Sequence, residues 1–166
     1  MPRSVRPEWE SLNAEAVCET GRRLGLAHLH VWRLATENIE TLTSAMRALP
    51  QVLNYNDFHW SNLALSLSRD PLRAVVYDYH LLGVGPRYSD CRNVANSLGE
   101  AARSASWQVY GTVDEREALL DEPVSVLYSL FVASTLGSFP NWAKSSLRKV
   151  ETAELETGIH KALSIL

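Results

Sequence analysis

Residues 53–63 read Leu53-Asn54-Tyr55-Asn56-Asp57-Phe58-His59-Trp60-Ser61-Asn62-Leu63. The stretch holds an aspartate and an asparagine five positions apart, Asp57 and Asn62, and a second aspartate, Asp78, closes the hydrophobic run Ala74-Val75-Val76-Tyr77. The residues between Asn62 and Asp78 predict a β-hairpin, because two β-prone runs flank the turn residues Ser68-Arg69-Asp70-Pro71. A hairpin brings its two ends together, so we expect Asn62 and Asp78 to lie near each other.

The oxygens of these three side chains are suited to phosphoryl transfer from ATP. That reaction needs an acceptor hydroxyl held in place, a group that takes its proton, and Mg²⁺ to neutralise the phosphate charge. Asp57 can position and deprotonate a hydroxyl, while Asn62 and Asp78 offer the hard oxygen ligands that Mg²⁺ prefers. The spacing of Asp57 and Asn62 alone arises by chance in many chains, and the alternative is a turn aspartate, an asparagine cap and an aspartate at a strand end.

The same residues resemble the motifs of the aminoglycoside phosphotransferase and choline kinase family, which has a protein-kinase-like fold. Residues 54–63 are similar to its catalytic loop, H-G-D-x-H-x-x-N followed by apolar residues. Val76-Tyr77-Asp78-Tyr79 is similar to its metal-aspartate motif, and Tyr88-Ser89-Asp90-Cys91-Arg92 to its later D-L-A segment. By this resemblance the cofactors are ATP and Mg²⁺, and the site residues are catalytic Asp57, His59 beside the phosphates, metal ligands Asn62 and Asp78, and loop supports Tyr55 and Asp90.

The resemblance also implies a fold. We expect a mainly α, α+β structure over residues 1–166, the helical C-terminal lobe of a protein-kinase-like fold with a small β-hairpin beside the catalytic loop. The motifs occupy residues 52–95, and the helical remainder, 96–166, is expected on the substrate side. The family's N-terminal nucleotide lobe is expected to be absent, because too few residues precede Asp57 and the only lysines are Lys144, Lys149 and Lys161.

Apolar periodicity, caps and breakers predict the other elements. We expect helices over residues 13–24, 36–48, 90–106, 114–120, from Pro123 onward, 140–150 and 155–166. Gly83-Val84-Gly85-Pro86 is expected to be a loop after Asp78. It is not expected to bind phosphate, because the third glycine of a G-x-G-x-x-G motif is missing. Five acids are expected to form a solvated face, namely Asp114, Glu115, Glu117, Asp121 and Glu122.

Composition excludes several classes of protein. A net charge of −3 argues against a general nucleic-acid surface. No apolar run is long enough to span a bilayer, and residues 1–8 lack the apolar stretch of a signal peptide. Cys18 and Cys91 are too few for a disulfide framework, which favours a cytoplasmic location. The histidines, cysteines and acids lack the tight spacing of a zinc site.

Two functions remain. The first is a small-molecule kinase, present as a truncated C-terminal lobe, that transfers the ATP γ-phosphate to a hydroxyl of an aminoglycoside, a choline-like alcohol or a sugar. The alternative is a catalytically inactive kinase-like fragment that acts as a binding module, which the lack of a lysine before Asp57 favours. We expect no nucleic-acid or membrane partner, and a homo-oligomer formed through the apolar surface that a missing lobe leaves exposed. No residue is assigned to acceptor binding.

Overall fold

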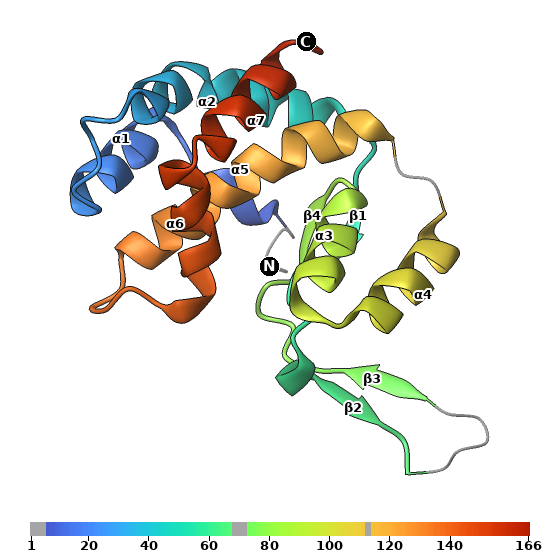
Figure 1. Ribbon diagram of the computed structural model, residues 1–166. Helices are drawn as coiled ribbons and strands as arrows, with labels where there is room; N and C mark the ends of the chain where they lie inside the picture. The colour runs from blue at the N-terminus through green and yellow to red at the C-terminus, as the bar shows by residue number, and fades with distance from the viewer. Residues whose placement is uncertain (1–5, 68–72, 112–113) are drawn as a thin grey trace, which may run out of the picture. The chain divides into compact units, whose positions relative to one another are not determined.

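The computed structural model describes residues 6–67, 73–111 and 114–166 (Figure 1). These residues form seven α-helices and two small two-stranded antiparallel sheets, so the mainly helical α+β fold class is confirmed. The chain divides into two compact units. We call Met1–Glu8 with Pro50–Asp114 the sheet unit, and Trp9–Leu49 with Glu115–Leu166 the helical unit. None of the described helices is long and apolar enough to cross a membrane.

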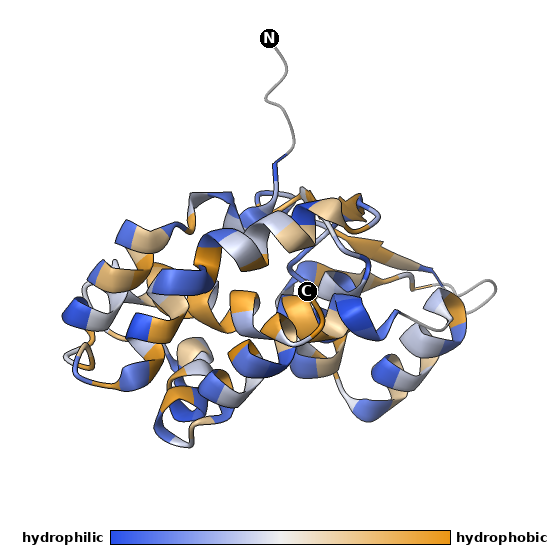
Figure 2. Cartoon of the chain, turned by 90° about the horizontal axis from the view of Figure 1, so that it is seen from above, coloured by the Kyte–Doolittle hydropathy of each residue, from blue (hydrophilic) through white to orange (hydrophobic). Residues whose placement is uncertain are grey.

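The helical unit contains five α-helices and the hydrophobic core. The helices are α1 (Ala14–Arg23), α2 (His30–Ala48), α5 (Glu115–Ser134), α6 (Lys144–Glu151) and α7 (Glu154–Leu163), with 3-10 turns at Glu8–Ser11 and Asn141–Ala143. Both hydrophobic and hydrophilic residues occur along the helices in Figure 2, as amphipathic helices require. Their apolar stripes meet in a core whose largest fully buried side chains are Ile39, Leu42, Met46, Leu120, Leu127, Leu130, Leu155 and Ile159.

The ends of α1 follow the predicted signals. The Asn13 side chain caps the helix by accepting the Ala16 N–H at 2.8 Å, and Gly25 adopts a left-handed φ of 72° just beyond it. The predicted start of α2 at residue 36 is wrong. The helix begins at His30, because the buried side chains of Val31 and Trp32 extend its apolar stripe toward the N-terminus.

The prediction that one helix ends near residue 120 and the next begins at Pro123 is also wrong. Pro123 lies inside the continuous helix α5. Proline removes one helical hydrogen bond, but Leu120 and Val124 on either side are fully buried, and their packing sustains the helix. Two of the five acids expected on a solvated face, Glu117 and Asp121, are buried at 5% and 1% exposure.

The sheet unit carries the residues predicted to form the functional site. Its elements are β1 (Val52–Asn54), a 3-10 turn (Trp60–Asn62), β2 (Leu63–Leu65), β3 (Ala74–Val76), β4 (Gly83–Gly85), α3 (Tyr88–Ser97) and α4 (Glu100–Tyr110). The predicted hairpin is the antiparallel pair β2–β3, in which Leu63 lies opposite Val76. The predicted turn at Ser68-Arg69-Asp70-Pro71 lies outside the described residues.

Two predictions for the sheet unit are wrong. Residues 83–85 are the buried strand β4, which pairs with β1, rather than a loop. Glycine is needed there because a Cβ on Gly83 would lie 2.8 Å from the Arg6 carbonyl oxygen, and one on Gly85 would lie 2.8 Å from Asn54 Oδ1. The single helix expected over residues 90–106 is two helices, α3 and α4, separated by an extended Leu98 and by Gly99.

Candidate functional site

The loop between β1 and β2 folds back on itself and joins Asp57 to Asn62. The Asn62 amide nitrogen donates to Asp57 Oδ2 at 2.6 Å and to the Asp57 carbonyl at 3.3 Å. Backbone bonds from His59 N to the Asp57 carbonyl, 2.7 Å, and from Asn62 N to the His59 carbonyl, 2.8 Å, tighten the turn. Because Asp57 engages the amide nitrogen, the carbonyl oxygen Oδ1 is the end of Asn62 that can bind a cation. In this structure Oδ1 accepts a long bond of 3.3 Å from Ser61 Oγ.

Asp78 follows β3 at the same end of the hairpin as Asn62. The N–H of Tyr77, its neighbour, donates to the Asn62 carbonyl at 3.1 Å, so the two chain segments are adjacent there. Asp78 has a left-handed φ of 66°, which is uncommon for a residue with a side chain. Its exposed carboxylate contacts the His80 ring through Oδ1 and Nδ1.

Tyr55 links the Asp57 loop to the segment that carries Asp78. Its hydroxyl donates to the Tyr77 carbonyl, and its ring packs edge-on against Phe58 and Tyr79, with centroids 5.0 and 5.7 Å away. Burial raises the pKa of Tyr55, and the negative charges of Asp57 and Asp78 raise it further. The hydroxyl therefore stays protonated and remains a hydrogen-bond donor.

Asp90, in the first turn of α3, binds the backbone of the loop that precedes Asp57. Asp90 is 4% exposed, and its carboxylate accepts the N–H of Tyr55 at 3.1 Å and the N–H of Asn56 at 2.9 Å. Burial raises the pKa of Asp90, while hydrogen bonds from Asn56, Tyr55 and the Asn54 side chain oppose that shift. Asn56 needs this support because its φ of 62° lies in the left-handed region.

A second loop support, Asn93, was not predicted. Its Oδ1 accepts the Phe58 N–H at 2.6 Å, and its Nδ2 donates to the Asn56 carbonyl at 3.1 Å. Asn93 lies three residues after Asp90, so both side chains project from one face of α3. That spacing within a predicted helix was the available signal. Together these residues give the sheet unit a polar interior, since its buried residues include Asn54, Asn56, Ser89 and Asp90.

The remaining predicted residue, His59, is exposed and turns to its neighbours. Its Nδ1 lies 2.8 Å from Ser61 Oγ, and its ring is 5.5 Å from that of Trp60. The structure thus joins Asp57 to Asn62, and Tyr55 to Asp90, while His59 and Asp78 make their side-chain contacts with other residues. Across residues 6–67, 73–111 and 114–166, no three His, Cys, Asp or Glu side chains gather in a way that could hold a metal. A metal at this site would therefore depend on the Asn62 oxygen.

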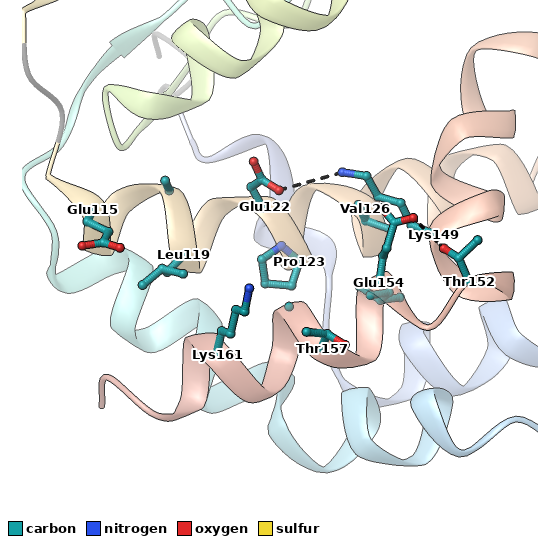
Figure 3. Close-up of a pocket in the computed structure, with 13 residues that line it drawn as sticks. Glu115, Leu119, Glu122, Pro123, Val126, Lys149, Thr152, Glu154, Thr157 and Lys161 are labelled. Carbon is teal, nitrogen blue, oxygen red and sulfur yellow. Dashed lines mark hydrogen bonds and ion pairs between the residues drawn. The ribbon is translucent and has the colours of Figure 1, made fainter.

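A groove in the helical unit is a separate candidate for ligand binding. It has a cavity volume of about 490 Å³, a floor that includes Leu119, Pro123 and Val126, and walls from α5, α6 and α7 (Figure 3). Its rim carries both signs of charge, with Lys149 Nζ 3.9 Å from Glu122 Oε2. The remaining charged lining residues are Glu115, Glu154 and Lys161.

No protein-family model, curated protein or solved structure matches this chain. The likeness to the phosphotransferase family rests on the motifs around Asp57, Asp78 and Asp90, and it stays a prediction.

Proposed function

We propose that this chain is the acceptor- and metal-binding part of a small-molecule phosphotransferase, with the protein-kinase-like C-terminal lobe seen in the aminoglycoside phosphotransferase and choline kinase family. The observation that carries the proposal is the direct contact of Asp57 with Asn62, at the end of a hairpin whose other strand leads into Asp78. The left-handed backbone at Asn56 and Asp78 adds support, because such strained residues cluster at functional sites.

The donor set fits Mg²⁺ bound to a nucleotide. Mg²⁺ is commonly held by one or two protein oxygens together with substrate phosphates, and it keeps several waters. Asn62 Oδ1 and the exposed Asp78 carboxylate are such oxygens, and a third protein ligand is not needed. When bound, MgATP would supply the phosphoryl group and the charge that neutralises it.

Asp57 is the residue we assign to the acceptor. Its carboxylate accepts a hydrogen bond from the acceptor hydroxyl, orients the oxygen and takes its proton as the new bond to the γ-phosphorus forms and the bond to the bridging oxygen of ADP breaks. The hydrogen bond from the Asn62 side-chain amide fixes Asp57 Oδ2, which leaves Asp57 Oδ1 for the acceptor hydroxyl. The supports from Tyr55 and Asp90 hold this geometry, so both act as positioning residues.

A second function, nucleotide or partner binding without turnover, has one observation in its favour. Every lysine lies in α6 or α7 of the helical unit, at Lys144, Lys149 and Lys161. Phosphotransferases of this type use a lysine to hold the α- and β-phosphates. In the family that the motifs resemble this lysine precedes the catalytic loop, and residues 1–56 contain no lysine.

The decisive experiment measures MgATP binding by calorimetry and ADP formation with aminoglycoside, choline-like and sugar acceptors. If the chain is a kinase, Asp57→Asn should abolish ADP formation while leaving MgATP affinity nearly unchanged. Asparagine can still accept the hydrogen bond from Asn62, but it cannot take the proton of the acceptor hydroxyl. Asp78→Ala should weaken MgATP binding itself. Glu40→Gln, which neutralises an exposed acid on α2, is the matched control and should alter neither quantity.

The two functions give different results. MgATP binding with no turnover for any acceptor supports the binding module. If the wild-type chain fails to bind MgATP at millimolar concentration, both the kinase and a nucleotide-binding module are ruled out.

A further inference from the structure

We propose that two copies of this chain associate through the outer edge of β2, which joins their β2–β3 hairpins into one four-stranded antiparallel sheet. The proposal does not depend on phosphotransfer. It begins with the distribution of exposed apolar side chains. Among the described residues, nine of the thirteen exposed large hydrophobic side chains lie between residues 52 and 82 of the sheet unit. Apolar surface gathered in this way marks an interaction site.

The hairpin itself is the most exposed part of this surface. It projects from the rest of the sheet unit in Figure 1, and its strands are coloured hydrophobic in Figure 2. Leu65 is 66% exposed, Leu67 is 104% exposed and Val75 is 57% exposed. An isolated two-stranded hairpin is marginally stable in water, and additional strands or a covering element stabilise it.

Backbone hydrogen bonding leaves the outer edge of β2 open at Leu65. The Tyr77 N–H bonds the Asn62 carbonyl, and the Ser66 N–H bonds the Arg73 carbonyl, so the even-numbered residues of this strand face β3. The alternate residues of an antiparallel strand direct their N–H and C=O groups outward, and Leu65 is one of them. Within the described residues its two outward groups have no partner.

Within the described residues, the outer edge of β3 is covered at Val76, whereas that of β2 is open at Leu65. The Tyr79 hydroxyl donates to the Val76 carbonyl of β3 at 2.7 Å, and Arg73, immediately before β3, adds a charge. Proteins commonly protect strand edges with charges, prolines or covering groups. Residues 60–67 contain no charged residue, no histidine and no proline. This difference selects β2 as the pairing edge.

A second copy of the chain is the partner that this edge fits. In a two-fold pairing centred on Leu65, the N–H of each Leu65 donates to the C=O of the other. Leu63 then lies opposite Leu67 of the second copy. All three leucines project from one face, because they alternate along the strand. No like charges meet, since the strand is uncharged. Such an interface is closed and uses the same residues twice.

The test is analytical ultracentrifugation over a range of protein concentrations. The paired edges are short compared with the roughly 1,200 Å² of a stable interface, so wild-type protein should show a reversible monomer–dimer equilibrium. Leu65→Lys and Leu65→Glu should each abolish the dimer, because the two-fold axis places the new charge of one copy opposite the same charge of the other. An equimolar mixture of these two variants should restore it. Val109→Lys, at a side chain 84% exposed on α4, is the matched control and should dimerise like wild type.

Circular dichroism establishes that each variant is folded. The proposal is overturned if folded wild-type protein stays monomeric throughout, if Leu65→Lys still dimerises, or if the mixed variants do not associate. Open-ended aggregates in place of a dimer would also contradict it, because a two-fold β2 pairing closes on itself.

Discussion

The buried carboxylate of Asp90 holds Asn56 in a left-handed conformation. Asp90 Oδ1 accepts the Asn56 N–H at 2.9 Å, and Asn56 has a φ of 62° immediately before Asp57. A left-handed backbone costs roughly 1–2 kcal/mol for most residues with a side chain, and less for asparagine. The conformation therefore persists because Asp90 and Asn93 both bind this part of the loop, and the direction of the Asp57 side chain depends on them.

Asp90→Asn should destabilise the protein. The Asp90 carboxylate accepts two backbone N–H groups, one on each oxygen, and asparagine retains only one acceptor oxygen. The unpaired N–H then faces an amide nitrogen in a buried site, which costs about 1–3 kcal/mol of unfolding free energy. Urea denaturation measures the change. Glu100→Gln, at a carboxylate 79% exposed on α4, is the control and should change stability by less than about 0.5 kcal/mol.

The Asp90 carboxylate should also make stability depend on pH. Burial raises its pKa above the ordinary value of 3.8. Between that value and the folded-state pKa, the folded chain keeps a proton that the unfolded chain has released, so stability falls as the pH rises through this window and levels off above it. The stability advantage of wild type over Asp90→Asn should therefore shrink as the pH rises from about 4. An advantage that grows with pH would show that the hydrogen bonds outweigh burial.

Local signals in the sequence predicted several parts of this structure. Turn residues between β-prone runs gave the β2–β3 hairpin, and the cap signals at Asn13 and Gly25 gave the ends of α1. The contact of Asp57 with Asn62 is local in the same way, because five residues of tight loop are enough to return one side chain to the other. Each of these features depends on residues that are close in sequence.

The features that were missed depend on distant contacts. Gly83 and Gly85 indicate a loop when taken alone, but they form a strand because they pair with β1. Glycine is needed there because the Arg6 backbone and Asn54 approach too closely for any side chain. Pro123 indicates a helix start, but packing on both sides carries α5 through it. The division into two units joins segments on either side of residues 50–114, which local periodicity does not reveal. Asn93 was missed because its role appears only when α3 meets the loop.

Tyr55→Phe should loosen the connection between the Asp57 loop and the Asp78 segment. The substitution keeps the ring contacts with Phe58 and Tyr79 but removes the hydroxyl that donates to the Tyr77 carbonyl. We expect a loss of about 1 kcal/mol of unfolding free energy. Tyr79→Phe is the matched control, because that hydroxyl is exposed and its loss should cost little. Equal effects from the two substitutions would contradict a structural role for the Tyr55 hydroxyl.

Gly85→Ala tests whether β4 must approach β1 as closely as the structure shows. The added Cβ would lie 2.8 Å from Asn54 Oδ1, and Asn54 is 1% exposed and donates to the Pro86 carbonyl at 3.2 Å. Relief of this overlap would shift Asn54, which also bonds Asp90, so we expect a loss of about 1–3 kcal/mol by denaturation. Gly137→Ala, where nothing lies within 4 Å of the new Cβ, should stay within about 0.5 kcal/mol of wild type. If Gly85→Ala is equally neutral, the close packing of β4 on Asn54 is incorrect.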